Sequence, residues 1–162
     1  MTAAPAGAIA YIFAANTGLV AKAFDGVAED QLWRRATPEN NPILWIAGHM
    51  VGTRALILRL LGETVDTGWG DLFARGASIG NESAYPSKDE VLRVHADLAA
   101  RLQAKLATLT ADDLGREAAV GPKPFGAKSF GDQLGFFALH DSYHAGQLGY
   151  VRKALGLSNL VG

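Results

Sequence analysis

Two histidines near the C-terminal end of the chain have the spacing of a metal-binding pair. His140 and His144 lie four residues apart in a segment whose apolar residues recur with helical periodicity. Side chains at positions i and i+4 of a helix project from one face, with their Cβ atoms roughly 5–6 Å apart. Both imidazoles can therefore bind the same metal ion. Two ligands make half of a site, and His49 and His95 are the remaining histidines that could complete it.

The residues around this pair favour a metal site over two hydrogen-bonded core histidines. His140 and His144 share their helix face with Phe137, Leu148 and Val151, so that face is expected to be buried. Buried imidazoles without a metal each need hydrogen-bond partners, and protonation of either would leave a buried charge. His49 and His95 also lie on apolar stripes, so spacing alone does not choose the third ligand.

Composition excludes several classes of function. The chain has 162 residues, which predicts a single domain over residues 1–162. A formal charge of −1 gives no basic surface for nucleic acid. The absence of cysteine excludes disulfides, thiolate ligands and a cysteine nucleophile, and it fits a cytoplasmic protein. The apolar N-terminal stretch is interrupted at residues 16–18, so neither a signal peptide nor a membrane span is expected.

Four segments carry the periodicity of long helices, and none reads as a strand. They cover residues 9–24, 42–60, 87–109 and 129–155. Asn41 is the predicted N-cap of the second, Ser87 with Glu90 forms a predicted capping box at the third, and Ser129 with Asp132 starts the fourth. The predicted fold is therefore all-α, a four-helix bundle.

The connection between the second and third helices is long and irregular. It runs from Glu63 to Pro86, with four glycines but also with aromatic residues that favour order. This length suffices to cross the bundle, so we expect the second and third helices to be parallel. Shorter elements are expected as helical turns over residues 29–35 and 110–114 and as a loop over residues 121–128.

Several residues are candidates for the second shell or for a ligand pocket. Gln147 and Asp141 stand three residues from His144, on either side, and could orient a ligand; a solvated helix face is the alternative for Asp141. Asn16 lies on the apolar stripe of the first helix, as a hydrogen-bonded core residue or as part of a pocket. Trp69 and Phe73 are expected to form pocket walls together with the first and third helices.

Two motifs resemble those of the DinB/YfiT-like superfamily of metalloenzymes. Residues 140–148 read HDSYHAGQL, similar to the family's His-x-x-x-His-x-Gly-Gln-Leu signature, and residues 41–49 read NPILWIAGH, similar to its helix-two histidine motif. Tyr85-Pro86-Ser87 also resembles the family's entry to the third helix. The resemblance implies a four-helix bundle with the metal ligands His49, His140 and His144. His95 matches no ligand of the family and is left as a core or pocket histidine.

Three neutral histidines on a divalent ion leave a coordination position open, as in catalytic sites. Zinc is the default ion for such a site, and nickel, iron and manganese are alternatives. The resemblance implies a metal-dependent S-transferase that activates a low-molecular-weight thiol for attack on a small-molecule electrophile. A hydrolase that activates water at the metal, or a non-enzymatic, metal-stabilised interaction protein, is the alternative. A homodimer is expected from the resemblance alone.

Overall fold

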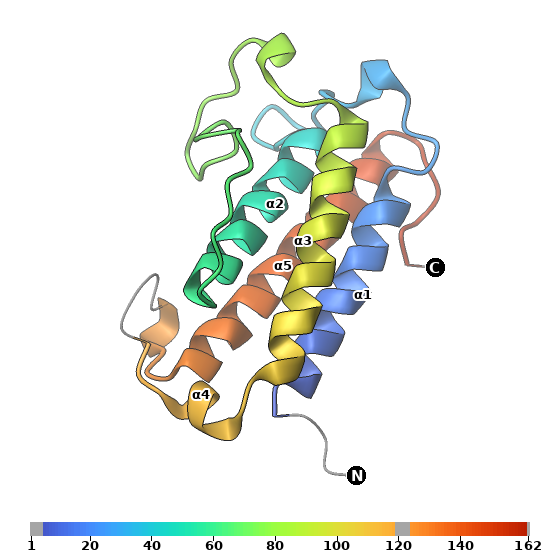
Figure 1. Ribbon diagram of the computed structural model, residues 1–162. Coiled ribbons are helices and arrows are strands. Elements are labelled where there is room, and N and C mark those ends of the chain that lie inside the picture. Colours follow the sequence, from blue (N-terminus) through green and yellow to red (C-terminus); the bar gives the residue numbers. More distant parts are fainter. Residues whose placement is uncertain (1–4, 119–123, 162) are drawn as a thin grey trace.

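The computed structural model describes residues 5–118 and 124–161, and it consists mainly of four long helices (Figure 1). They are α1 (Gly7–Ala23), α2 (Ile43–Leu60), α3 (Lys88–Thr108) and α5 (Phe130–Ala154). Shorter helices are η1 (Glu29–Gln31), η2 (Glu82–Ala84), α4 (Ala111–Gly115) and η3 (Pro124–Gly126). Within the described ranges there is no β-strand, only an isolated bridge between Glu117 and Ser129. The predicted all-α class is confirmed. Residues 121–123 of the predicted loop over residues 121–128 lie outside the described ranges.

Local side-chain caps begin two of the long helices. Ser129 accepts a hydrogen bond from the amide of Asp132, whose carboxylate bonds back to the Ser129 amide, so the predicted capping box is complete. Ser87 also caps α3 through the amide of Glu90, but the Glu90 carboxylate binds Arg93 instead. That capping box is therefore only half formed.

The start of α2 differs from its prediction. Pro42, with an extended backbone, is the N-cap residue in place of Asn41, and no side chain caps the helix. The connection between α1 and α2 supplies a hydrogen-bond acceptor for the first turn of α2, in place of a side-chain cap. The amide of Leu44, in the first turn, donates to the carbonyl of Leu32. A first-turn amide that already has a partner does not need a side-chain cap.

The segment between α2 and α3, residues 61–87, returns along the length of the bundle, and we call it the crossover segment. In Figure 1 it leads from the end of α2 to the opposite end of the molecule, where α3 begins. Glu63, just after α2, forms ion pairs with Arg101 and Lys105, which lie in the second half of α3. The C-terminal parts of α2 and α3 therefore lie together, and the two helices run in the same direction.

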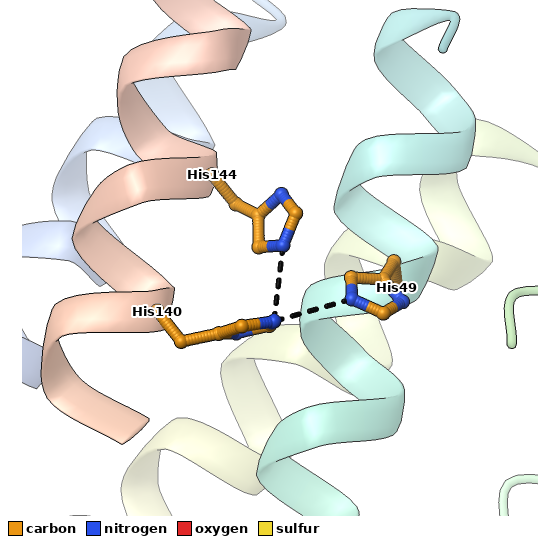
Figure 2. Close-up of side chains that lie close together, drawn as sticks. All are labelled: His49, His140 and His144. Atoms are coloured by element: carbon orange, nitrogen blue, oxygen red, sulfur yellow. Dashed lines mark hydrogen bonds between the residues drawn. The ribbon is translucent and has the colours of Figure 1, made fainter. Parts of the chain in front are cut away.

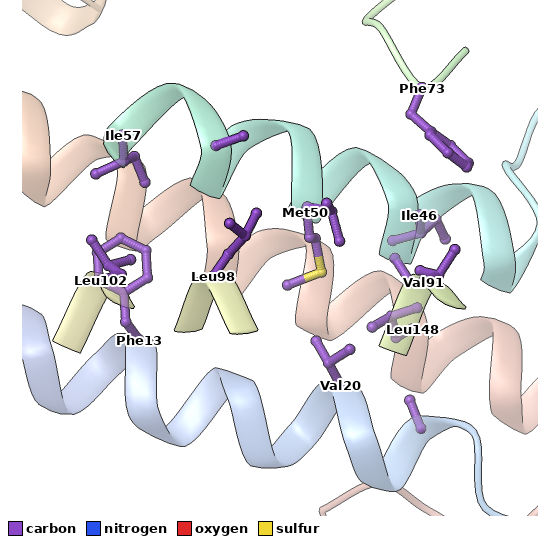
Figure 3. Packing of buried hydrophobic residues seen from close by; sticks show 14 of the residues in the cluster. Phe13, Val20, Ile46, Met50, Ile57, Phe73, Val91, Leu98, Leu102 and Leu148 are labelled. Atoms are coloured by element: carbon purple, nitrogen blue, oxygen red, sulfur yellow. The ribbon is translucent and has the colours of Figure 1, made fainter. Parts of the chain in front are cut away.

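A continuous apolar core fills the space between the long helices. Figure 3 shows Phe13 and Val20 of α1 facing α2, with residues of α3 and α5 between and beside them. α2 is long and apolar enough to cross a membrane by length and composition alone. However, 72% of it is buried inside the bundle, which is the pattern of a core helix.

Candidate metal centre

Three histidines converge between α2 and α5, and we call them the histidine cluster. Figure 2 shows His140 and His144 projecting from successive turns of α5 toward His49 on α2. The Nε2 atom of His140 lies 3.1 Å from that of His144 and 3.4 Å from that of His49. One nitrogen from each ring can be chosen so that all three lie within 4.8 Å of one another. His95, the other candidate for the third ligand, lies on α3 and is not in the cluster.

Hydrogen bonds on the far side of two rings fix which nitrogen faces the centre. His49 donates from Nδ1 to the carbonyl oxygen of Phe73 at 2.8 Å, and His144 donates from Nδ1 to Oε1 of Gln147 at 2.7 Å. Gln147 in turn donates to the hydroxyl of Tyr143. Because both acceptors are carbonyl oxygens, each Nδ1 carries the hydrogen, and each Nε2 presents a lone pair. This arrangement is typical of histidine ligands oriented by their second shell.

The cluster fits a metal ion better than it fits hydrogen bonds alone. His49 and His144 both offer lone pairs, and His140 can donate an Nε2 hydrogen to only one of them. The Nδ1 atom of His140 is buried and has no partner among the described residues. A tetrahedral ion with metal–nitrogen distances near 2.0–2.1 Å separates its ligand nitrogens by about 3.3 Å. The separations of the His140 Nε2 atom from those of His144 and His49, 3.1 and 3.4 Å, match that value.

Burial keeps two histidines of the cluster, His140 and His144, in the neutral form that metal binding requires. Desolvation is the largest cause that lowers the pKa of His140 to about 4, and the neighbouring His49 and Arg75 lower it further. Desolvation also lowers the pKa of His144 to about 4, with a further contribution from His140. Both imidazoles are therefore uncharged at neutral pH, and a metal need not displace protons from them.

The His49 ring is held on two sides. The indole of Trp45, one turn earlier on α2, stacks on it with a ring separation of 5.3 Å and an angle of 6° between the planes. The Phe73 carbonyl of the crossover segment holds its Nδ1 atom. Phe73 can approach this closely because Gly48 has no side chain. A Cβ atom at Gly48 would lie only 2.3 Å from the Phe73 ring.

A family comparison covers this whole arrangement. The family model of the DinB superfamily matches residues 12–148, a range that contains all three histidines of the cluster. The chain belongs to the DinB superfamily. No curated protein sequence matches it. The family that the motifs at residues 41–49 and 140–148 resemble is therefore confirmed. The cluster of three histidines is consistent with metal binding in this DinB protein.

The contact between Gly48 and Phe73 leads to a prediction about metal affinity in this DinB chain. Gly48→Ala should push the Phe73 ring away and remove its carbonyl from His49, lowering metal affinity by about 10-fold or more. Gly52→Ala is the matched control, because a Cβ atom there meets nothing within 4 Å. It should leave affinity unchanged. Competition with a chromophoric chelator measures both, and equal affinities for the two variants would contradict the proposed role of Gly48.

Asp141 lies outside the histidine cluster, although it follows His140 directly. It is 1% exposed and forms an ion pair with Arg54 of α2, which is fully buried. The Arg54 guanidinium also donates to the Thr17 hydroxyl and the Phe13 carbonyl. The pair therefore joins α1, α2 and α5. The solvated-face alternative for Asp141 is wrong. The Asp141 carboxylate accepts two hydrogen bonds from the Arg54 guanidinium. None of the described hydrogen bonds joins Asp141 to the His144 ring.

Two other polar residues expected near a site are core residues. Asn16 is 4% exposed and donates from its amide nitrogen to the Ser142 hydroxyl at 3.0 Å, which links α1 to α5. It borders a groove between these two helices, whose lining does not include the histidine cluster. His95 is 2% exposed, and its Nε2 atom has no partner within the described part of the chain.

Trp69 and Phe73 do line a cavity that also includes His49. Its other wall is α2, and within the described residues neither α1 nor α3 contributes to it. The expectation that the first and third helices form the walls is therefore wrong for this cavity. Instead, α3 packs against α2 and α1 packs against α5 in the core of the bundle.

Acid should destabilise the metal-free protein. Burial lowers the pKa of His95 to about 3 and those of His140 and His144 to about 4, against 6.5 as the ordinary value. Below pH 6.5 the unfolded chain therefore binds protons that the folded chain does not, and stability falls as the pH falls. We expect a loss of about 2 kcal/mol for each of these three histidines between pH 7 and 4.5.

Urea denaturation in the presence of a chelator measures this loss. The His95→Leu variant lacks one of the three titrating groups and should show a smaller pH dependence than the unaltered chain. Equal stability of the unaltered protein at pH 7 and 4.5 would contradict the prediction.

Proposed function

We propose that this protein is a metal-dependent S-transferase that joins a low-molecular-weight thiol to a small electrophile. His49, His140 and His144 would hold the divalent ion, for which zinc is the first choice and nickel, iron and manganese are alternatives. The observation that carries the proposal is a ligand group made only of imidazoles, beside a cavity that can admit a small molecule. Three neutral ligands leave the charge of a divalent ion uncompensated and a coordination position open.

The residues around the ion would orient the ligands and keep them neutral. The Phe73 carbonyl and the Gln147 amide hold the Nδ1 hydrogens of His49 and His144, so that both Nε2 atoms remain available. A bound divalent ion would supply the charge that favours thiolate over thiol at the open position. In the overall reaction the sulfur forms a bond to an electrophilic carbon, the leaving group departs with its electron pair, and the thiol proton goes to solvent.

The charges near the cluster favour a thiol over water as the nucleophile. A hydrolase of this kind normally needs a general base beside the metal. In the described part of the chain, no carboxylate belongs to the histidine cluster. Asp141, the neighbour of His140, is paired with the buried Arg54. With no cysteine in the chain, the sulfur must arrive with a substrate.

Cobalt-substituted protein tests the proposal directly. Thiolate ligation should produce an intense near-ultraviolet charge-transfer band when glutathione, a mycothiol-type thiol or a bacillithiol-type thiol is added. His140→Ala protein, treated in the same way, should show no band. If no thiol changes the spectrum while activated esters are hydrolysed in a metal-dependent way, the hydrolase alternative replaces the transferase. If neither occurs, the proposal is overturned in favour of a metal-stabilised interaction protein.

A further inference from the structure

One side of α5 faces away from the bundle core and is apolar along most of the helix. Its residues are Phe136, Leu139, Tyr143, Gly146 and Tyr150, which we call the outer face. They recur at intervals of three and four residues, the heptad spacing that aligns side chains for packing against a second helix. Leu139, Tyr143 and Tyr150 are 61%, 62% and 55% exposed. The described part of the chain therefore presents helix-packing residues without a helix packed on them.

The outer face has the composition of an interface rather than that of a solvated helix side. The charged residues of α5 are Asp132, Asp141, Arg152 and Lys153. Asp141 and Arg152 are buried, and the other two lie near the opposite ends of the helix. A helix that is apolar on all sides is normally covered on all sides. Tyrosine and phenylalanine without charged neighbours are typical of the centre of a protein–protein interface.

Phe125 enlarges the outer face beyond the start of α5. It is 92% exposed, and its ring lies 6.0 Å from that of Phe136. An aromatic side chain that is fully covered buries about 150–250 Å², so Phe125, Tyr143 and Tyr150 together offer roughly 400 Å² of surface, to which Leu139 adds. A stable dimer buries about 800 Å² on each partner, about 65% of it apolar in homodimers. The outer face is therefore close to the apolar area that one partner of a stable dimer contributes.

The outer face is arranged so that it can match a second copy of itself. Phe136 and Tyr150 lie seven residues before and after Tyr143. This separation is about 10.5 Å along the helix axis in each direction. A two-fold rotation centred on Tyr143 therefore places Phe136 against the partner's Tyr150. Gly146, close to the centre, has no side chain, so the two helix backbones can approach each other there.

The same rotation brings a projecting side chain to a groove. Phe125 projects beside Phe136, at the N-terminal end of the outer face. At the other end, Tyr150 lines a groove of about 470 Å³ between α1 and α5, with apolar walls from Leu19 and Leu160. The partner's Phe125 then lies at the end of the face where this groove opens.

We propose that this chain forms a two-fold symmetric homodimer through the outer face, with the two α5 helices antiparallel and the axis at Tyr143. A second copy is favoured over an unrelated protein because the face is self-complementary under a two-fold rotation, the property of an isologous interface. The dimer contact would also cover the outer end of the hydrogen-bond chain that runs from His144 through Gln147 to Tyr143. The inference is independent of the reaction under the proposed function.

Sedimentation equilibrium over a range of protein concentrations tests the dimer. The unaltered protein should approach twice the 17.1 kDa of one chain. Leu139→Glu should raise the dissociation constant of the dimer about 100-fold or more, because it places a charge in an apolar contact. Tyr11→Glu is the matched control, since Tyr11 is 75% exposed on α1, outside the outer face, and this variant should remain dimeric. Circular dichroism confirms that both variants are folded.

Single cysteine variants test the position of the axis. The chain has no cysteine, so an introduced one can cross-link only to its counterpart. At a concentration that sedimentation shows to be dimeric, mild oxidation of Tyr143→Cys should give a disulfide-linked dimer on a non-reducing gel. Tyr150→Cys should not, because its two copies would lie about 21 Å apart along the helices, beyond the reach of a disulfide. A monomer at all concentrations, a dimer that Leu139→Glu leaves intact, or cross-linking of Tyr150→Cys in place of Tyr143→Cys overturns the inference.

Discussion

Alanine in place of His140 is expected to abolish tight metal binding, with a loss of affinity of at least about 100-fold. His140 is the ring whose Nε2 atom lies within 3.4 Å of both other Nε2 atoms, so its removal leaves only His49 and His144. Two ligands on different helices bind a divalent ion far more weakly than three. Metal analysis of purified protein, followed by competition with a chelator, gives the affinity.

The matched control for that experiment is His95→Leu. His95 is buried away from the cluster with an unpartnered Nε2 atom, so leucine removes a desolvated polar group at similar volume. Metal affinity should be unchanged and thermal stability equal or higher. Loss of metal in His95→Leu, with retention in His49→Ala or His140→Ala, would show that the ligand set is wrong.

Removal of the Asp141 carboxylate should cause the largest loss of stability of any single substitution considered. In Asp141→Ala, Arg54 would remain 0% exposed without its ionic partner. Breaking a buried pair in this way typically costs about 3–5 kcal/mol. For a chain of this length the melting temperature should fall by about 6–20 °C. Differential scanning calorimetry of metal-free protein measures the change without a contribution from the metal.

A double variant separates the cost of an unpaired charge from the value of the pair itself. Arg54→Met combined with Asp141→Leu replaces both charges with apolar groups of similar volume, and most of the lost stability should return. Thr17 and the Phe13 carbonyl would lose a donor, so recovery is expected to be incomplete. A double variant as unstable as Asp141→Ala would show that the ion pair is itself required for the packing of α1, α2 and α5.

Much of the fold was predictable because its signals are local. Ser129 with Asp132 caps α5 through atoms only three residues apart, and the apolar periodicity of each long helix follows from its own sequence. The proximity of His140 and His144 is also a local property, because every α-helix places positions i and i+4 on one face whatever surrounds it. The start of α2 was misplaced because its first-turn partner, Leu32, comes from another segment.

The partner of the histidine pair depended on long-range geometry. His49 and His95 both lie on apolar stripes, and the order of the helices around the bundle decides between them, because α2 packs against α5 whereas α3 packs against α1 and α2. The structure brings His49 to His140 across 91 residues of sequence and leaves His95 in the core. Asp141 was ambiguous for the same reason, because its partner Arg54 is 87 residues away.

By itself, the sequence determined the helices, the parallel course expected from a long crossover, and a histidine pair suited to a metal. Gly48 and Gly52 lie inside the second helix, where a glycine marks either close packing or room for a ligand, and the sequence does not assign either role. Tertiary structure decided between them: the Phe73 ring occupies the space beside Gly48, whereas the space beside Gly52 is open cavity. The crossover segment has no periodicity from which its course could be derived. Its contacts with α2 exist only because the packed bundle provides a surface for its aromatic side chains.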